Sequence, residues 1–121
     1  MKTYSVADVE LLIHRLSASN HATTDTGILN KLKQAFQQDP PLVLPNYQKQ
    51  KLATLLFALL GSPSHSGYVA KYRLAAVELL GFIGDKSVRN VLAERLKVEW
   101  FDSITNILRT AIEAIDQRLK K

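Results

Sequence analysis

Hydrophobic residues recur at every third or fourth position through most of the chain, which is the spacing of an α-helix with one buried side. The first such pattern covers residues 5–17, where Ser5 and Asp8 resemble a capping box. The second follows a polar N-cap at Thr23 or Thr24 and must end before Pro40, because proline cannot continue a helix. The pattern therefore predicts two amphipathic helices before the first proline.

Residues 39–45 hold three of the four prolines and predict a stiff, extended connector whose apolar residues lie against the helices. A third helix is expected from a cap at Asn46 to a stop at Gly61, with apolar residues around most of its circumference. We expect this helix to be central. The Ser-, Pro- and Gly-rich residues 62–67 predict a loop.

Residues 72–97 predict two helices joined by a sharp turn. In the first of them, Ala75 and Ala76 are small enough for a neighbouring helix to approach closely. Gly84 is expected to end it in the left-handed conformation, and Asp85 is expected to cap the next helix. That next helix has one apolar and one polar side.

The C-terminal part predicts a sixth helix that begins at Asp102 as its cap. Its apolar stripe consists of Ile104, Ile107, Leu108, Ala111, Ile112, Ile115 and Leu119. Trp100 and Phe101 lie between the last two helices, where large aromatics can cover the end of a core. Six helices account for most of the chain, so the predicted fold class is all-α.

The central residues 72–97 also carry a resemblance to a known family. The residues concerned are Arg73 before Ala75 and Ala76, then Leu80 and Gly81, then Ile83, Gly84 and Asp85, followed by a Val-x-x-Leu helix. Here the chain resembles HEAT-like repeats of the phycobilisome-lyase type. The resemblance is strong over residues 69–119 only. It implies a short right-handed α-solenoid, armadillo/HEAT-like, of about six helices in one domain over residues 1–121.

Two internal alignments bear on this repeat reading. Residues 76–80 align with residues 111–115 at an offset of 35, which is the length of a helix pair with its turns. Lys51-Leu52-Ala53 aligns with Arg73-Leu74-Ala75 at an offset of 22, which is too short for a full pair. The repeat register of the N-terminal half is therefore left open.

Composition sets the broad class of protein. A chain of 121 residues with 46% hydrophobic content fits a single domain with its own core. It has no cysteine, which excludes disulfides and thiolate metal sites and fits a reducing compartment, so a cytoplasmic location is the simplest expectation. No apolar run approaches the length needed to span a membrane.

The sequence contains few patterns that indicate a metal site, a nucleotide site or a catalytic residue. His14, His21 and His65 share no helical spacing and have no carboxylate pair beside them, so we expect no metal site. Gly81 and Gly84 lack the Lys-Ser/Thr of a phosphate-binding loop, and no strained turn marks a nucleophile. We therefore expect no catalytic residue and no cofactor.

Basic residues provide the one candidate site. Lys49, Lys51, Lys71 and Arg73 recur near the starts of two successive helices, and we predict that they form a cationic stripe that binds a partner. The alternative interpretation is that the lysines are solvated surface residues without a binding role. The formal net charge of +5 permits attraction to an acidic protein or to nucleic acid.

These observations favour a non-catalytic protein-interaction or scaffold module whose partner is another protein, with an acidic protein as one option. The resemblance to phycobilisome-lyase repeats implies an alternative, an accessory or chaperone-like subunit for bilin attachment or phycobilisome turnover. A second alternative is a basic nucleic-acid binder, similar in architecture only to the HEAT-like alkylpurine DNA glycosylases. The sequence leaves the choice open.

Overall fold

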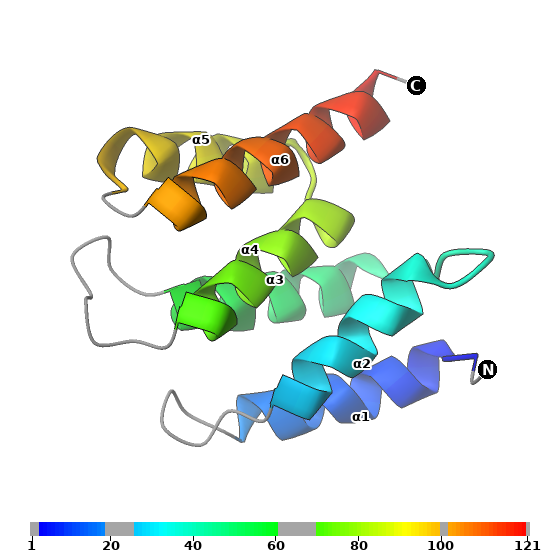
Figure 1. The fold of residues 1–121 in the computed structure, drawn as a ribbon. Coiled ribbons are helices and arrows are strands. Elements are labelled where there is room, and N and C mark those ends of the chain that lie inside the picture. The colour runs from blue at the N-terminus through cyan, green and yellow to red at the C-terminus, as the bar shows by residue number, and fades with distance from the viewer. Residues whose placement is uncertain (1–2, 19–25, 61–69, 100–101, 121) are drawn as a thin grey trace. The chain divides into compact units, whose positions relative to one another are not determined.

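The computed structural model describes residues 3–18, 26–60, 70–99 and 102–120, and every secondary-structure element in these ranges is an α-helix (Figure 1). The elements are α1 (Val6–Ser17), α2 (Thr26–Gln37), α3 (Asn46–Leu60), α4 (Ala70–Ile83), α5 (Lys86–Val98) and α6 (Asp102–Leu119). The predicted all-α class is confirmed. The predicted loop at residues 62–67, His21, His65, Trp100 and Phe101 lie outside the described residues.

The contacts between residues divide the chain into two compact units, Met1–Leu55 and Leu56–Lys121. Helix α3 runs through the boundary between them. The expected single domain over residues 1–121 stays a prediction. No helix in the described part of the chain combines the length and the apolar character needed to cross a bilayer.

In the first unit, α1 packs against α2. The predicted capping box at the start of α1 is confirmed, because the Ser5 amide donates to Asp8 Oδ2 at 2.9 Å and the Asp8 amide donates to Ser5 Oγ at 3.2 Å. Gln38 holds the chain just before α1. Its Oε1 accepts from the Tyr4 amide at 2.8 Å and its Nε2 donates to the Tyr4 carbonyl at 3.0 Å. Gln38 therefore connects the segment before α1 to the end of α2.

The connector before α3 is mostly exposed, with Leu44 buried and Leu42 partly buried. Leu44 is buried and the Leu42 amide donates to the Ala35 carbonyl, so this segment does lie against a helix, as predicted. Val43, between them, is exposed. The Asp39–Pro40 peptide bond is cis. Asn46 is the first residue of α3 instead of its cap, since the Pro45 carbonyl accepts from the backbone amides of residues 48 and 49.

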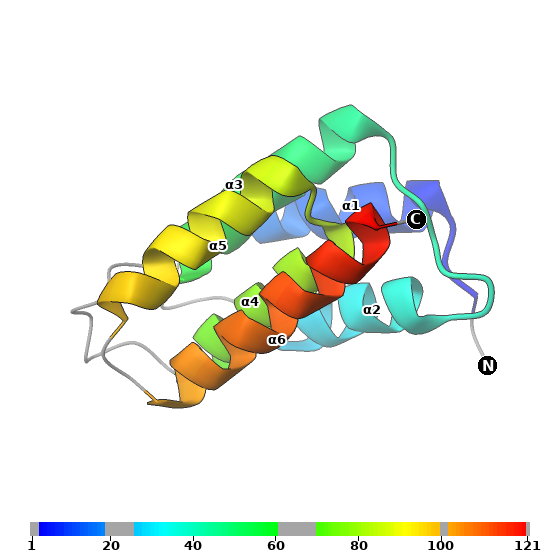
Figure 2. The ribbon, with the colours of Figure 1, turned by 90° about the horizontal axis from the view of Figure 1, so that it is seen from above.

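In the second unit, α6 packs against both α4 and α5. Helices α4 and α6 run alongside each other in the same direction, and α5 runs antiparallel to them (Figures 1 and 2). The alignment at an offset of 35 agrees with this packing, because Ala76 and Ala111 are both buried, as are Leu80 and Ile115. Equivalent positions of α4 and α6 thus face the core.

Two glycines set how closely these helices approach. A Cβ added to Gly81 would lie 3.1 Å from both Cα and Cβ of Ala111, so α4 and α6 cross at this point with little space to spare. A Cβ on Gly84 would lie 2.6 Å from Ile115 Cδ1 and 2.7 Å from the Leu80 carbonyl oxygen. Gly84 does not adopt the left-handed conformation that we expected. Close packing, and not a positive φ, requires glycine there.

Polar contacts fix the turn between α4 and α5. The Arg118 guanidinium donates to the carbonyls of Gly81 and Gly84, each at 2.6 Å, and so caps the C-terminus of α4 from α6. Asp85 caps α5 as predicted, because its Oδ1 accepts from the Val88 amide at 3.0 Å and from Ser87 Oγ at 2.6 Å. These bonds lower the pKa of the Asp85 carboxyl below its ordinary value, with the Ser87 hydroxyl as the largest cause.

Candidate interaction surface

Arg73, one of the four residues of the predicted stripe, is a core residue. Only 2% of its surface is exposed. Its Nε donates to the Leu60 carbonyl at 2.9 Å, and its Nη2 donates to Glu99 Oε1 at 2.9 Å. A guanidinium held in this way is not open to a partner, so the expectation that Arg73 contributes to a surface stripe is corrected.

Arg73 belongs to a buried group of charges, the Arg73–Glu99–Arg95 cluster. Glu99 Oε2 accepts from Arg95 Nε at 2.7 Å, and Arg95 Nη2 also approaches the Leu60 carbonyl at 3.5 Å. The Glu99 side chain has 0% exposure, and those of Arg73 and Arg95 have 3% and 13%. Because both arginines bond one carboxylate and one helix-terminal carbonyl, the cluster joins the ends of α3, α4 and α5.

A signal in the sequence could have located Arg73. It precedes Ala76, Val77 and Leu80 at spacings of three, four and seven residues, and all three are buried. On a helix, these positions share one face. A charged residue on such a face must be paired, because an unpaired buried charge costs several kcal/mol. The identity of its partner, Glu99, is not indicated by any local spacing.

The two lysines of α3 do not lie on one face. Lys51 is exposed and Lys49 is partly buried. Residues two apart on an α-helix are separated by roughly 200°, so these side chains leave α3 on nearly opposite sides. The Lys71 side chain lies outside the described part of the structure. The structure therefore does not bring Lys49, Lys51 and Arg73 together as one stripe.

A different surface is present on α3. Tyr47, Gln50, Lys51 and Thr54 are all exposed, and their spacings of three, four and seven residues place them on one side of the helix. Tyr47 is 65% exposed, and Val43, four residues earlier in the connector, is 74% exposed. We call four of these residues the α3 face: Tyr47, Gln50, Lys51 and Thr54.

A buried neighbouring side chain orients the phenol of Tyr47. Gln48 has only 2% of its surface exposed, and its Nε2 donates to the Tyr47 hydroxyl oxygen at 3.3 Å. An exposed aromatic held by a buried neighbour loses less conformational entropy on binding than a freely rotating side chain does. The Tyr47 ring is therefore less free to rotate than an exposed tyrosine without such a bond.

The stretch of the chain that contains the α3 face has no acidic residue. All 11 acidic residues of the chain lie outside residues 40–77, and α3 itself carries Lys49 and Lys51 with no carboxylate. The Lys and Arg residues in this range are the four of the predicted stripe, of which Arg73 is buried and paired with Glu99. The acid-free range is visible in the sequence, and it marks the part of the chain from which the α3 face is built.

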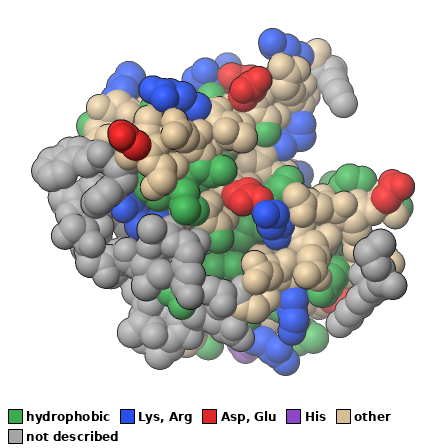
Figure 3. Space-filling model, viewed as in Figure 1, with side chains coloured by type: hydrophobic (Ala, Val, Ile, Leu, Met, Phe, Trp, Pro, Cys, Tyr) green, Lys and Arg blue, Asp and Glu red, His purple; other side chains and the backbone are tan. Residues whose placement is uncertain are grey.

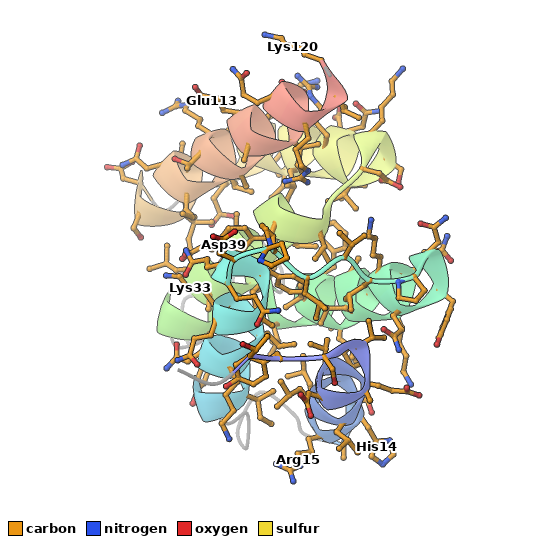
Figure 4. All side chains as sticks on the ribbon, turned by 90° about the vertical axis from the view of Figure 1, so that its right-hand side faces the viewer. His14, Arg15, Lys33, Asp39, Glu113 and Lys120 are labelled. Carbon is orange, nitrogen blue, oxygen red and sulfur yellow. The ribbon has the colours of Figure 1, made fainter. Side chains whose placement is uncertain are left out.

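The outer side of α6 differs, because its charges alternate. Arg109, Glu113 and Lys120 are all exposed, and Figure 4 shows Glu113 and Lys120 pointing outward from the helix. In Figure 3, Lys and Arg side chains lie near Asp and Glu along the α5 and α6 edge of the second unit. Such a mixture is typical of a solvated helix surface.

No metal-binding group is seen in the described ranges, where no three His, Asp or Glu side chains gather. His14 is exposed in the last turn of α1, and it points outward beside Arg15 (Figure 4). Comparisons with protein-family models, with curated proteins and with solved structures find no match. The candidate site therefore rests on the α3 face alone.

Proposed function

We propose that this chain is a non-catalytic protein-interaction or scaffold module, built as a short right-handed HEAT-like solenoid. The solenoid proposal is supported by the second unit, where α4 and α6 run alongside each other and bury equivalent positions one repeat length apart. Gly81 against Ala111 provides the close crossing that stacked repeats need.

The observation that carries the interaction role is the exposure of Tyr47 within the α3 face. Monomeric proteins expose single apolar side chains often, but a tyrosine oriented by a buried glutamine is the kind of residue that dominates binding energy at interfaces. The flanking Gln50, Lys51 and Thr54 supply the polar rim that interfaces have. The bilin-related and nucleic-acid alternatives stay predictions of the sequence.

Site-specific photo-crosslinking tests this function. Tyr47 is replaced by a photoreactive phenylalanine analogue in the native host, and the matched control carries the same analogue at Glu113 on the mixed-charge side of α6. We expect one defined protein adduct from position 47 that is missing from position 113. Equal adduct patterns at the two positions, or none at either, would contradict a dedicated surface on α3.

A further inference from the structure

We infer that the end of α2 carries a binding site for an extended, tyrosine-containing peptide segment of a partner protein, and that residues 3–5 of this chain occupy that site themselves. The two residues that recognise the segment are Gln34 and Gln38, which we call the α2 glutamine pair. The site includes no residue of the α3 face, so the inference goes beyond the proposed function and does not depend on it.

Gln38 recognises the main chain of the segment. Its Oε1 accepts from the Tyr4 amide at 2.8 Å, and its Nε2 donates to the Tyr4 carbonyl at 3.0 Å. A carboxamide that bonds both polar groups of one residue reproduces the pair of bonds that a neighbouring strand makes in an antiparallel sheet. These bonds do not involve the side chain of the bound residue, so they fit any residue except proline, which has no amide hydrogen.

Gln34 recognises the side chain. The Tyr4 hydroxyl donates to Gln34 Oε1 at 3.1 Å, and only 6% of the surface of Tyr4 is exposed. The buried ring requires a large aromatic residue, and the hydroxyl bond distinguishes tyrosine from phenylalanine. Main-chain bonds combined with a pocket for one side chain are the means by which proteins bind extended peptides.

The bound segment has the alternating exposure of an extended chain. Thr3 and Ser5 are exposed and Tyr4, between them, is buried. Gln34 is also exposed, and Figures 1 and 2 show the start of α1 and the end of α2 at the same end of this helix pair. A partner's segment can therefore follow the same path, with the residues on both sides of its tyrosine in solvent.

Helix α1 keeps its N-terminal cap without the occupied site. The capping box consists of Ser5 and Asp8 alone, each bonded to the other's backbone amide. Neither bond involves Tyr4 or the α2 glutamine pair. Tyr4 can therefore leave the site while α1 retains both bonds of its cap, which makes the segment exchangeable.

Attachment to the same chain makes the segment of residues 3–5 a strong competitor. A short tether gives a bound group an effective concentration in the millimolar range. A partner's segment binds only the open fraction of the protein, so its apparent Kd is the intrinsic Kd divided by that fraction. The site is thus self-inhibited, and weakening the hold on Tyr4 should open it.

The test adds the peptide acetyl-Lys-Thr-Tyr-Ser-Val-amide, which copies residues 2–6, to the full chain and follows backbone amide shifts in two-dimensional NMR spectra. We expect the Kd to fall in the order wild type, Tyr4→Phe, Tyr4→Ala, because the chain's own segment is held less tightly at each step. The decrease from wild type to Tyr4→Ala should be roughly tenfold or more. Tyr4→Phe keeps the buried ring, so it tests the order without loss of core packing.

Variants of the α2 glutamine pair locate the bound peptide. In the Tyr4→Ala chain, Gln38→Met should raise the Kd roughly tenfold, because both main-chain bonds are lost. Gln37→Met, at the exposed neighbouring glutamine, is the matched control and should leave the Kd unchanged. In the Tyr4→Phe chain, a peptide with phenylalanine in place of tyrosine should bind about two- to tenfold more weakly, and Gln34→Met should abolish this difference.

Three results would overturn the inference. If the peptide binds wild type and Tyr4→Phe equally, or binds neither, residues 3–5 are only an internal contact of the fold. A preference for tyrosine that survives Gln34→Met would place the peptide elsewhere on the chain. Wild-type dimers that form at high concentration in sedimentation experiments and are lost in Tyr4→Ala would assign the site to a second copy of this chain instead of a partner protein.

Discussion

The segments Lys51-Leu52-Ala53 and Arg73-Leu74-Ala75 look alike in sequence but face different surroundings. In α3, Lys51 is exposed while Leu52 and Ala53 are buried. In α4, Arg73 is buried while Leu74 and Ala75 are only partly buried. The same three-residue pattern thus presents its basic residue to solvent in one helix and to the core in the other.

Matching residue types in the two segments therefore do not correspond to matching burial in the two helices. Burial in the two helices agrees best at an offset of 24, which pairs Leu52 with Ala76 and Leu56 with Leu80, all four buried. The residue types, in contrast, match at an offset of 22. A shift of two residues along a helix corresponds to a rotation of roughly 200°. This rotation is enough to move a position from the solvent-exposed side of the helix to its buried side.

The largest effect is expected from the buried carboxylate that holds Arg73. Glu99→Gln removes the carboxylate that pairs with two largely buried guanidinium groups, so the free energy of unfolding should fall by about 3–5 kcal/mol. Urea denaturation measures this change. The matched control is Glu94→Gln in the exposed Lys97–Glu94 pair, where we expect at most about 1 kcal/mol. Similar losses in both variants would contradict the structural role of the Arg73–Glu99–Arg95 cluster.

Replacing Arg73 and Lys51 one at a time should show directly how differently the two residues contribute to stability. Arg73→Met is expected to cost about 2–3 kcal/mol, less than Glu99→Gln, because Arg95 still pairs with Glu99. Lys51→Met removes a solvated charge and should stay within about 0.5 kcal/mol of wild type. Thermal unfolding monitored by circular dichroism is sufficient to rank the two. Equal melting temperatures would mean that the two positions are equivalent after all.

A smaller effect is expected where α4 ends. In Gly84→Ala the added methyl group meets Ile115 Cδ1 and the Leu80 carbonyl oxygen, and overpacking should destabilise the chain by about 1–3 kcal/mol. Gly81→Ala meets only Ala111, at 3.1 Å, and should cost less. Chemical denaturation of the two variants tests this order. A stabilised Gly84→Ala would show that the backbone conformation, and not the space, matters there.

The smallest effect concerns the Asp85 cap and depends on pH. Because the folded-state pKa is lowered from its ordinary value of 3.8, the charged cap stabilises the fold above that value, and this contribution is lost as the pH falls through the folded-state pKa. Asp85→Asn keeps a capping side chain but no charge. The stability difference between wild type and Asp85→Asn should be constant near neutral pH and should shrink only in the acid range. Urea unfolding over that range checks the sign.

The sequence by itself determined the helices and most of their ends. Apolar spacing predicted six helices, and the side chains of Ser5 and Asp85 formed the caps that their positions indicated. These features are local, because a cap or an amphipathic stripe involves residues within one or two turns of each other. The acid-free range that contains the α3 face was also present in the sequence.

Only the tertiary structure decided which residues of different helices pair with one another. Arg73 is paired with Glu99, 26 residues away, and Gly84 is required by Ile115 of another helix. Contacts between residues so far apart have no periodic signature, so the sequence does not say which residue pairs with which. The candidate stripe was therefore predicted from four basic residues, whereas the α3 face depends on the direction in which Tyr47 and Lys51 leave a helix whose other side is buried.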